Sequence, residues 1–145
     1  MIHLPQSPPA TSASVRASMR GNRSSRTKPE LLLVQALAEA GVSGFVSNEK
    51  ELPGAPDIAF ADARVVVFVH GCFWHRCPYC SPHFPDTNQD YWTAKFARNK
   101  ARDKRVKAKL RASGIKAVVV WECQLKKNPR RVIRRIAKAL EASRG

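Results

Sequence analysis

The sequence predicts a mixed α/β fold in which a mixed β-sheet is flanked by helices. Two almost wholly apolar runs, at 65–69 and 115–121, are typical of strands that are covered on both faces. Residues 90–112 and 129–143 have the polar composition and apolar periodicity of helices, so strands and helices alternate. A chain of 145 residues has room for one domain of this kind and little more.

The N-terminal segment differs in composition from the rest of the chain. Residues 1–18 are rich in Pro, Ser, Ala and Thr, which predicts a disordered tail. We therefore expect a single domain over residues 19–145, of which 19–29 form a basic arm. A helix is predicted to follow from a capping box, with Thr27 as its N-cap and Glu30 at its third position.

The middle of the chain predicts a short strand at 44–48 and then a hairpin. Residues 57–61 and 65–70 are two strands with only three residues between them. A two-residue turn puts Asp57 opposite Phe68 and close to His70. The sequence therefore predicts a carboxylate near an imidazole at one end of the hairpin.

The second half of the chain predicts a long basic helix and a closing helix. Residues 71–90 are expected to be irregular, and Asp90 to cap a helix that ends near Ala112, before Gly114. The strand at 115–121 follows, and Pro129 begins the last helix. The predicted order is α-β-β-β-α-β-α.

The charge is strongly positive and unevenly distributed. The chain has 26 Lys and Arg against 11 Asp and Glu, a net charge of +15. Residues 1–29 carry +5, residues 30–94 carry −5 and residues 95–145 carry +15. A basic chain around a mildly acidic middle favours a polyanion binder with a metal-dependent site. A solvated basic surface, or an RNA binder of the ribosomal kind, are the alternatives.

The four cysteines predict a structural zinc site. Three lie in one loop, where Cys77 and Cys80 form a C-x-x-C pair after Cys72, and Cys123 follows the late strand. Four thiolates satisfy tetrahedral Zn²⁺ completely and leave no open position for catalysis. Two disulfides are the alternative, which is typical of small secreted proteins.

Three motifs carry a resemblance to a known family. They are LPGAPD at 52–57, VFVHGCFWH at 67–75 and VWEC at 120–123, and Met19, Arg20 and Glu30 match the N-terminal segment of the same family. In these residues the chain resembles the very-short-patch repair endonucleases over about residues 15–140. The resemblance implies a restriction-endonuclease-like core and a nick in one DNA strand, 5′ of the thymine of a T:G mismatch. Such mismatches arise when 5-methylcytosine deaminates.

The resemblance also implies a set of catalytic residues. Asp57 and the backbone carbonyl of Val69 match the family's Mg²⁺ ligands, and His70 and His75 match its two histidines. His75 is expected to be the principal base, helped by His70. Glu30 is expected to support the site, although a capping role alone would also explain it. Val69 stands where the familiar member of the family has Thr, so a hydroxyl is absent here.

The resemblance further implies how DNA is held. Phe73, Trp74 and Trp92 match aromatic side chains that wedge into the base stack. Packing against Phe96 and Val106 is the alternative for Trp92. The remaining expected DNA contacts are Met19, Arg20, Lys95 and Asn99.

Two other functions remain open. One is a nicking or restriction nuclease of the same fold without mismatch preference, and the other is a zinc-stabilised DNA-binding module without catalysis. We expect an intracellular, cytoplasmic protein without a membrane span, because no apolar run approaches ~20 residues. A monomer suits an asymmetric lesion, and mismatch-repair proteins are the partners that the resemblance implies.

Overall fold

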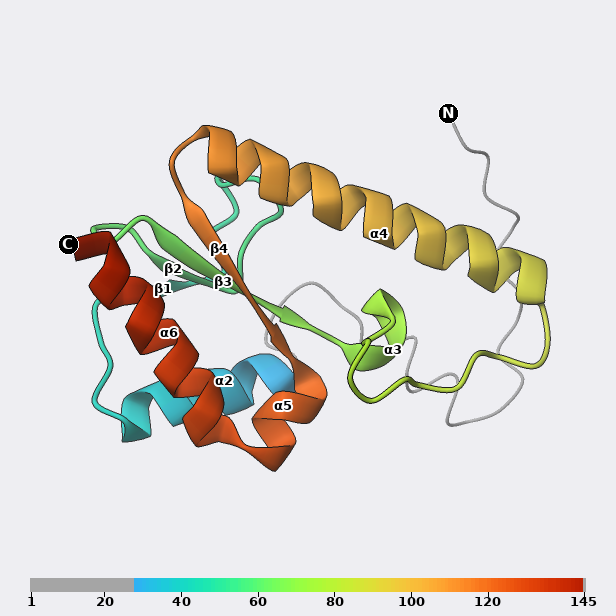
Figure 1. Cartoon of the computed structure of the whole chain (residues 1–145), viewed down its shortest axis with the longest axis horizontal. Coiled ribbons are helices and arrows are strands. Elements are labelled where there is room, and N and C mark those ends of the chain that lie inside the picture. The colour runs from blue at the N-terminus through green and yellow to red at the C-terminus, as the bar shows by residue number, and fades with distance from the viewer. Residues whose placement is uncertain (1–27, 145) are drawn as a thin grey trace.

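A computed structural model describes residues 28–144 of the chain (Figure 1). The predicted tail, the basic arm, Met19, Arg20 and the Thr27 cap lie outside the described residues. None of the helices within 28–144 combines the length and apolar character that crossing a membrane requires.

The centre of the fold is a four-stranded mixed sheet in the order β1-β2-β3-β4. Its strands are β1 Val46–Ser47, β2 Ile58–Phe60, β3 Val65–His70 and β4 Lys116–Trp121. The β1–β2 and β2–β3 pairs are antiparallel, whereas β3 and β4 are parallel. Parallel strands need a long crossover, which the segment between β3 and β4 supplies. The predicted mixed sheet is confirmed.

Helices cover both faces of this sheet (Figure 1). On one face lie α2 Lys28–Glu39, α5 Glu122–Lys127 and α6 Pro129–Arg144, and on the other lies the long α4 Gln89–Ala112. Because both faces are covered, Val65, Val66 and Val67 in the central strand β3 are all buried.

Two apolar clusters fill the space between the sheet and the helices. The larger one joins β2, β3 and β4 to α2, α5 and α6, and includes Leu33, Val120 and Ile136. The smaller one joins Val66 to Leu110 of α4. Burial of these side chains is what fixes the sheet between its two helical layers.

The β2–β3 register is the one that the hairpin pattern predicts. Ile58 pairs with Val67 and Phe60 with Val65, so Asp57 stands one step before this ladder, beside Phe68. The turn closes with a hydrogen bond from the Arg64 amide to the Ala61 carbonyl at 3.2 Å. The register therefore directs Asp57 to the end of the sheet where β3 terminates.

Several element boundaries differ from the prediction. The strand at 44–48 is only two residues long. The loop after β3 contains a single helical turn, α3 Cys72–His75, and a further short helix, α5, follows β4 directly. The N-cap of α4 is Asn88 in a left-handed conformation, so the capping role predicted for Asp90 is wrong. Asp90 instead places a negative charge in the first turn.

At Gly54 the loop before β2 lies close against α4. Its φ is +77°, and a Cβ built there would lie 2.5 Å from Val106 Cγ1. Gly44 has a similar φ of +82°, but a Cβ there would meet nothing within 4 Å. Gly54 is thus needed both for its conformation and for space, whereas Gly44 is needed for its conformation alone.

We expect Gly54→Ala to lower the free energy of unfolding by about 1–3 kcal/mol more than Gly44→Ala does, because only the former overpacks a stiff β-branched neighbour. Urea denaturation of the two variants measures this difference. Equal losses in the two variants would contradict the proposed close contact with Val106.

Candidate active site and metal centre

The four cysteines form one cluster. Cys72 begins α3, Cys77 and Cys80 follow that turn, and Cys123 lies in α5. Their sulfur atoms all lie within 4.8 Å of one another. The cluster joins two segments that are far apart in sequence: the loop after β3 and the helix after β4.

The geometry of this cluster fits zinc. In a tetrahedron with Zn–S bonds of about 2.3 Å, the sulfurs stand about 3.8 Å apart. Cys77 Sγ and Cys123 Sγ are 3.7 Å apart. Backbone amides also donate to two of the sulfurs, Tyr79 to Cys77 Sγ and Cys123 to Cys72 Sγ, each at 3.4 Å. The donor set and its hydrogen bonds are consistent with a structural zinc site.

Asp57 lies where β2 begins, against the end of β3. The Val69 amide donates to Asp57 Oδ2 at 2.7 Å, which fixes the carboxylate beside the backbone of the neighbouring strand. The pKa of Asp57 is raised to about 6, chiefly by burial. The charge of Glu30 contributes to the rise, whereas the hydrogen bond from Val69 and the charge of His75 oppose it. A buried carboxylate with a second acid nearby is a favourable donor set for a hard divalent cation.

Glu30 belongs to this site as well as to the first turn of α2. Its side chain is only 2% exposed, and its charge acts on Asp57. The structure therefore places the acid of the predicted capping box next to the predicted catalytic carboxylate. Its cap partner, Thr27, lies outside the described residues.

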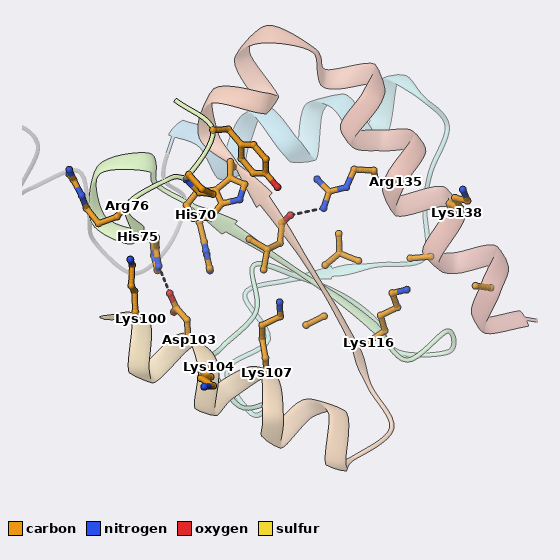
Figure 2. Close-up of a pocket in the computed structure, with 18 residues that line it drawn as sticks. His70, His75, Arg76, Lys100, Asp103, Lys104, Lys107, Lys116, Arg135 and Lys138 are labelled. Atoms are coloured by element: carbon orange, nitrogen blue, oxygen red, sulfur yellow. Dashed lines mark hydrogen bonds and ion pairs between the residues drawn. The ribbon is translucent and has the colours of Figure 1, made fainter. Parts of the chain in front are cut away.

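His75 is held by a carboxylate on the long helix. Its Nδ1 is 2.7 Å from Asp103 Oδ2, and both side chains are largely buried (Figure 2). Burial opposes ionisation of Asp103, but the hydrogen bond and charge of His75 outweigh it and lower the pKa of Asp103. An ionised Asp103 can accept a hydrogen from Nδ1, and Nε2 is then the nitrogen at which His75 would take a proton.

His70, the last residue of β3, stacks on His75. The two ring centroids are 3.9 Å apart with an angle of 7° between the planes. The pKa of His70 is lowered to about 4, chiefly by burial and in part by the charge of His75, so His70 is neutral near pH 7. Its buried Nδ1 has no hydrogen-bond partner among the described residues.

The aromatic residues beside this site form one packed cluster. Phe73 and Trp74 on α3 contact Trp92 of α4 at centroid distances of 5.3 and 5.8 Å. Trp92 stacks on Phe96 and is 5% exposed, as the packing alternative expects, whereas Phe73 and Trp74 are half-buried. In this cluster the more accessible rings of Phe73 and Trp74 therefore pack on the buried ring of Trp92.

Two polar side chains hold the loop that carries these rings. Asn99 donates to the Trp74 carbonyl at 3.1 Å, and Arg76 lies over three rings, 4.6 Å from the centroid of Phe96. Arg76 also donates to carbonyls of the loop, including that of His83 at 3.4 Å. The predicted DNA contact Asn99 therefore also has a structural partner. Lys95 lies one turn earlier on α4 and is half-buried.

Sequence reasoning missed Asp103 and Arg76. Asp103 is the only carboxylate in residues 91–121, in the midst of a basic helix, and this isolation was the available signal. Arg76 gave no signal, because one arginine between His75 and Cys77 is indistinguishable from a surface charge. Conversely, His83 is exposed, as its lack of a motif predicts, and its side chain pairs with that of Asp86.

We expect one zinc ion per chain and its loss in Cys80→Ser, with the free energy of unfolding falling by roughly 3 kcal/mol or more. Metal analysis and thermal unfolding measure this. Tyr79→Phe is the matched control, since it alters an exposed neighbour and keeps all four thiolates. A full complement of zinc in Cys80→Ser would contradict the four-sulfur site.

We expect Asp57→Asn to stabilise the protein by up to about 3 kcal/mol when no divalent ion is present. The raised pKa means that the ionised carboxylate costs stability above about pH 6, and that this cost fades as the pH falls towards the ordinary value of 3.8. Denaturation at several pH values measures the gain. The exposed Asp86→Asn should show none, and a destabilised Asp57→Asn at neutral pH would contradict the buried charge.

The chain is similar to known proteins over most of its length. The profile of DNA mismatch endonuclease Vsr matches residues 10–80. The Type II nicking enzyme V.XorIIP of Xanthomonas oryzae is 43% identical over 110 residues, which cover 76% of this chain and 80% of that protein. The Type II nicking enzyme V.NmeAIP of Neisseria meningitidis is 40% identical over 103 residues, covering 71% and 73%.

A relative with mismatch in its name is also similar. DNA mismatch endonuclease Vsr of Escherichia coli is 34% identical over 109 residues, which cover 75% of this chain and 69% of that protein. The mixed sheet between two helical layers is the restriction-endonuclease-like core that the resemblance implies. The chain belongs to the family of DNA mismatch endonuclease Vsr, a family of DNA endonucleases.

Proposed function

We propose that this protein nicks one DNA strand 5′ of the thymine in T:G mismatches that arise from deamination of 5-methylcytosine, and so initiates very-short-patch repair. The observation that carries the proposal is the convergence of one half-buried carboxylate and two stacked imidazoles where β3 ends. Asp57 reaches this point through its hydrogen bond to Val69, and His75 through its bond to Asp103. Beside it stands an aromatic cluster on the cysteine-bound loop.

Mg²⁺ is the cation that we propose for this site. The Asp57 carboxylate and the Val69 backbone carbonyl would hold it, with the charge of Glu30 nearby. When bound, Mg²⁺ would neutralise charge on the scissile phosphate. The fit comes from the chemistry of the donors, because a carboxylate whose pKa is raised by burial gains most from a cation beside it. Val69 provides the carbonyl without the hydroxyl of a threonine.

His75 is the proposed general base. Asp103 orients its ring and stabilises the positive charge that it acquires on taking a proton from the attacking water. The water oxygen forms a bond to phosphorus, the bond from phosphorus to the 3′ oxygen breaks, and the products are a 5′-phosphate and a 3′-hydroxyl. The stacked, neutral His70 excludes water from one face of His75 and helps to position it.

Phe73 and Trp74 are the proposed wedge that tests base stacking. A mismatch lowers the cost of unstacking, and an inserted ring restores part of the lost stacking. Trp92 supports the wedge from its buried position on α4. Met19, Arg20, Lys95 and Asn99 are the further proposed DNA contacts. We also propose that the protein acts as a monomer on the bacterial nucleoid, alongside mismatch-repair proteins.

A nicking nuclease without mismatch preference is the second candidate. Two relatives that are at least 40% identical bear the name Type II nicking enzyme, whereas the relative named for mismatches is 34% identical. The two candidates share the same catalytic residues. They differ in whether the aromatic wedge selects the mismatch, so the choice of DNA substrate separates them.

We expect strand-specific nicking of T:G duplexes, weaker nicking of U:G and little of matched duplexes, all requiring Mg²⁺. Asp57→Ala and His75→Ala should each lower the rate roughly 10²–10⁴-fold while DNA binding persists, because they remove chemistry rather than binding surface. A strand-resolved gel assay measures both. Equal rates on matched DNA would establish the second candidate. Unchanged DNA biochemistry in both variants would favour a DNA-binding module without catalysis.

A further inference from the structure

A groove runs along the free edge of the sheet, away from the catalytic histidines. Strand β4 lies at the edge of the sheet, and α4 and α6 rise on either side of that edge (Figure 1). The space between them is a groove of about 930 Å³ that begins at His70 and His75 and follows β4 past Val119. The six residues of β4 span roughly 20 Å.

The walls of this groove are strongly basic. Three lysines follow one face of α4 at helical spacing, one lies at the start of β4, and two cations face them from α6 (Figure 2). These groove cations are Lys100, Lys104, Lys107, Lys116, Arg135 and Lys138. All six are exposed. The only carboxylate among the lining residues, Asp103, is bonded to His75, so none in the lining is left to neutralise the lysines.

The order of residues along α4 relates the groove to the proposed reaction. Trp92, at the start of the helix, contacts the aromatic wedge. Asp103, eleven residues on, holds the proposed base. Lys104 and Lys107 follow on the side that faces β4 (Figure 2). The aromatic cluster, the proposed base and the groove therefore succeed one another along a single helix.

We propose that this groove binds the sugar–phosphate backbone of the nicked strand on the 5′ side of the nick. The assignment of the strand rests on the proposed function. If the nick lies 5′ of the mismatched thymine and the wedge lies at the mismatch, the DNA on the 5′ side of the nick extends from the active site in the direction away from the wedge. Phosphates are the ligands that a row of exposed lysines without carboxylates recognises. The groove adds affinity that does not depend on the mismatch.

An acidic peptide strand pairing with β4 is the rival occupant. The Arg135 side chain makes such strand pairing less favourable. Its Nη2 donates to the Val119 carbonyl at 3.0 Å, so this acceptor on β4 is already used. Lysines along an edge strand can also serve only to prevent pairing between sheets of two molecules. Both alternatives give results that differ from those of a phosphate track.

The test compares two double variants of α4 in DNA binding without added Mg²⁺. Lys104→Ala/Lys107→Ala removes two groove cations, and Arg105→Ala/Lys109→Ala removes two exposed cations of the same helix that do not line the groove. On matched duplex DNA the groove variant should lower the slope of log K against log salt by about 2 and weaken binding roughly ten- to thirtyfold near physiological salt. The control should change both by less than half as much.

A second arm identifies the strand. Duplexes with a fixed T:G mismatch are extended by about six base pairs, roughly 20 Å, on the 5′ or the 3′ side of the nick position. Wild-type protein should gain affinity from the 5′ extension only, and the groove variant should lose that gain. A gain from the 3′ side alone, or equal salt slopes for both double variants, overturns the proposal.

The remaining outcomes separate the rivals and the two proposals. Poly-glutamate of the same total charge as the DNA is the competitor for the peptide rival. If it displaces the DNA from wild-type protein, and if the groove variant loses affinity for poly-glutamate but not for DNA, an acidic peptide occupies the groove and the proposal fails. If the groove variant self-associates while its DNA binding is unchanged, the lysines protect the edge and the proposal fails. If the protein shows no T:G preference but the salt-slope difference persists, the phosphate track stands and the proposed mismatch function fails.

Discussion

The four-sulfur cluster is the constraint on which the rest of the site depends. The loop after β3 has three prolines and no long regular element, and by itself it has little to fold around. The clustering of its cysteines with Cys123 brings this loop to the start of α5, where β4 ends. Since His75 lies between Cys72 and Cys77, the position of the imidazole follows from the position of the sulfurs. Phe73 and Trp74 lie in the same interval and pack against Trp92 of α4.

The site combines two electrostatic environments that shift the pKa values of its two aspartates in opposite directions. On the β2 side, burial and Glu30 make the negative charge of Asp57 costly, which prepares that carboxylate for a cation. On the α4 side, the hydrogen bond and charge of His75 lower the pKa of Asp103, while burial keeps His70 neutral. Asp57, whose ionised form a cation would stabilise, and His75, the proposed base, thus lie together where β3 ends. Pairs of groups with opposed environments of this kind are characteristic of hydrolytic sites.

Much of this arrangement could be predicted from local patterns, and the rest could not, for identifiable reasons. The run of valines in β3 and the three residues before it define both the central strand and the register that brings Asp57 to Val69. The cysteine spacing defines the metal cluster. The pairing of His75 with Asp103 depends on the angle at which α4 crosses the sheet, which no local pattern encodes. The burial of Trp92 depends on the same crossing. Helix α5, which carries Cys123 beside the other cysteines, has no local pattern that predicts it.

Helix α4 is uninterrupted over 24 residues and contributes to three parts of the molecule. Trp92 belongs to the aromatic cluster, Asp103 contacts His75, and Leu110 belongs to the smaller apolar cluster. Each residue of an α-helix advances 1.5 Å and turns about 100°. Inserting a single residue between Phe96 and Asp103 would therefore leave the rings in place and swing the carboxylate off the imidazole. An insertion of seven residues would restore the direction of the carboxylate but would carry it about 10 Å further along the helix axis. The aromatic end and the chemical end of α4 are therefore tied to one length as well as to one rotational phase.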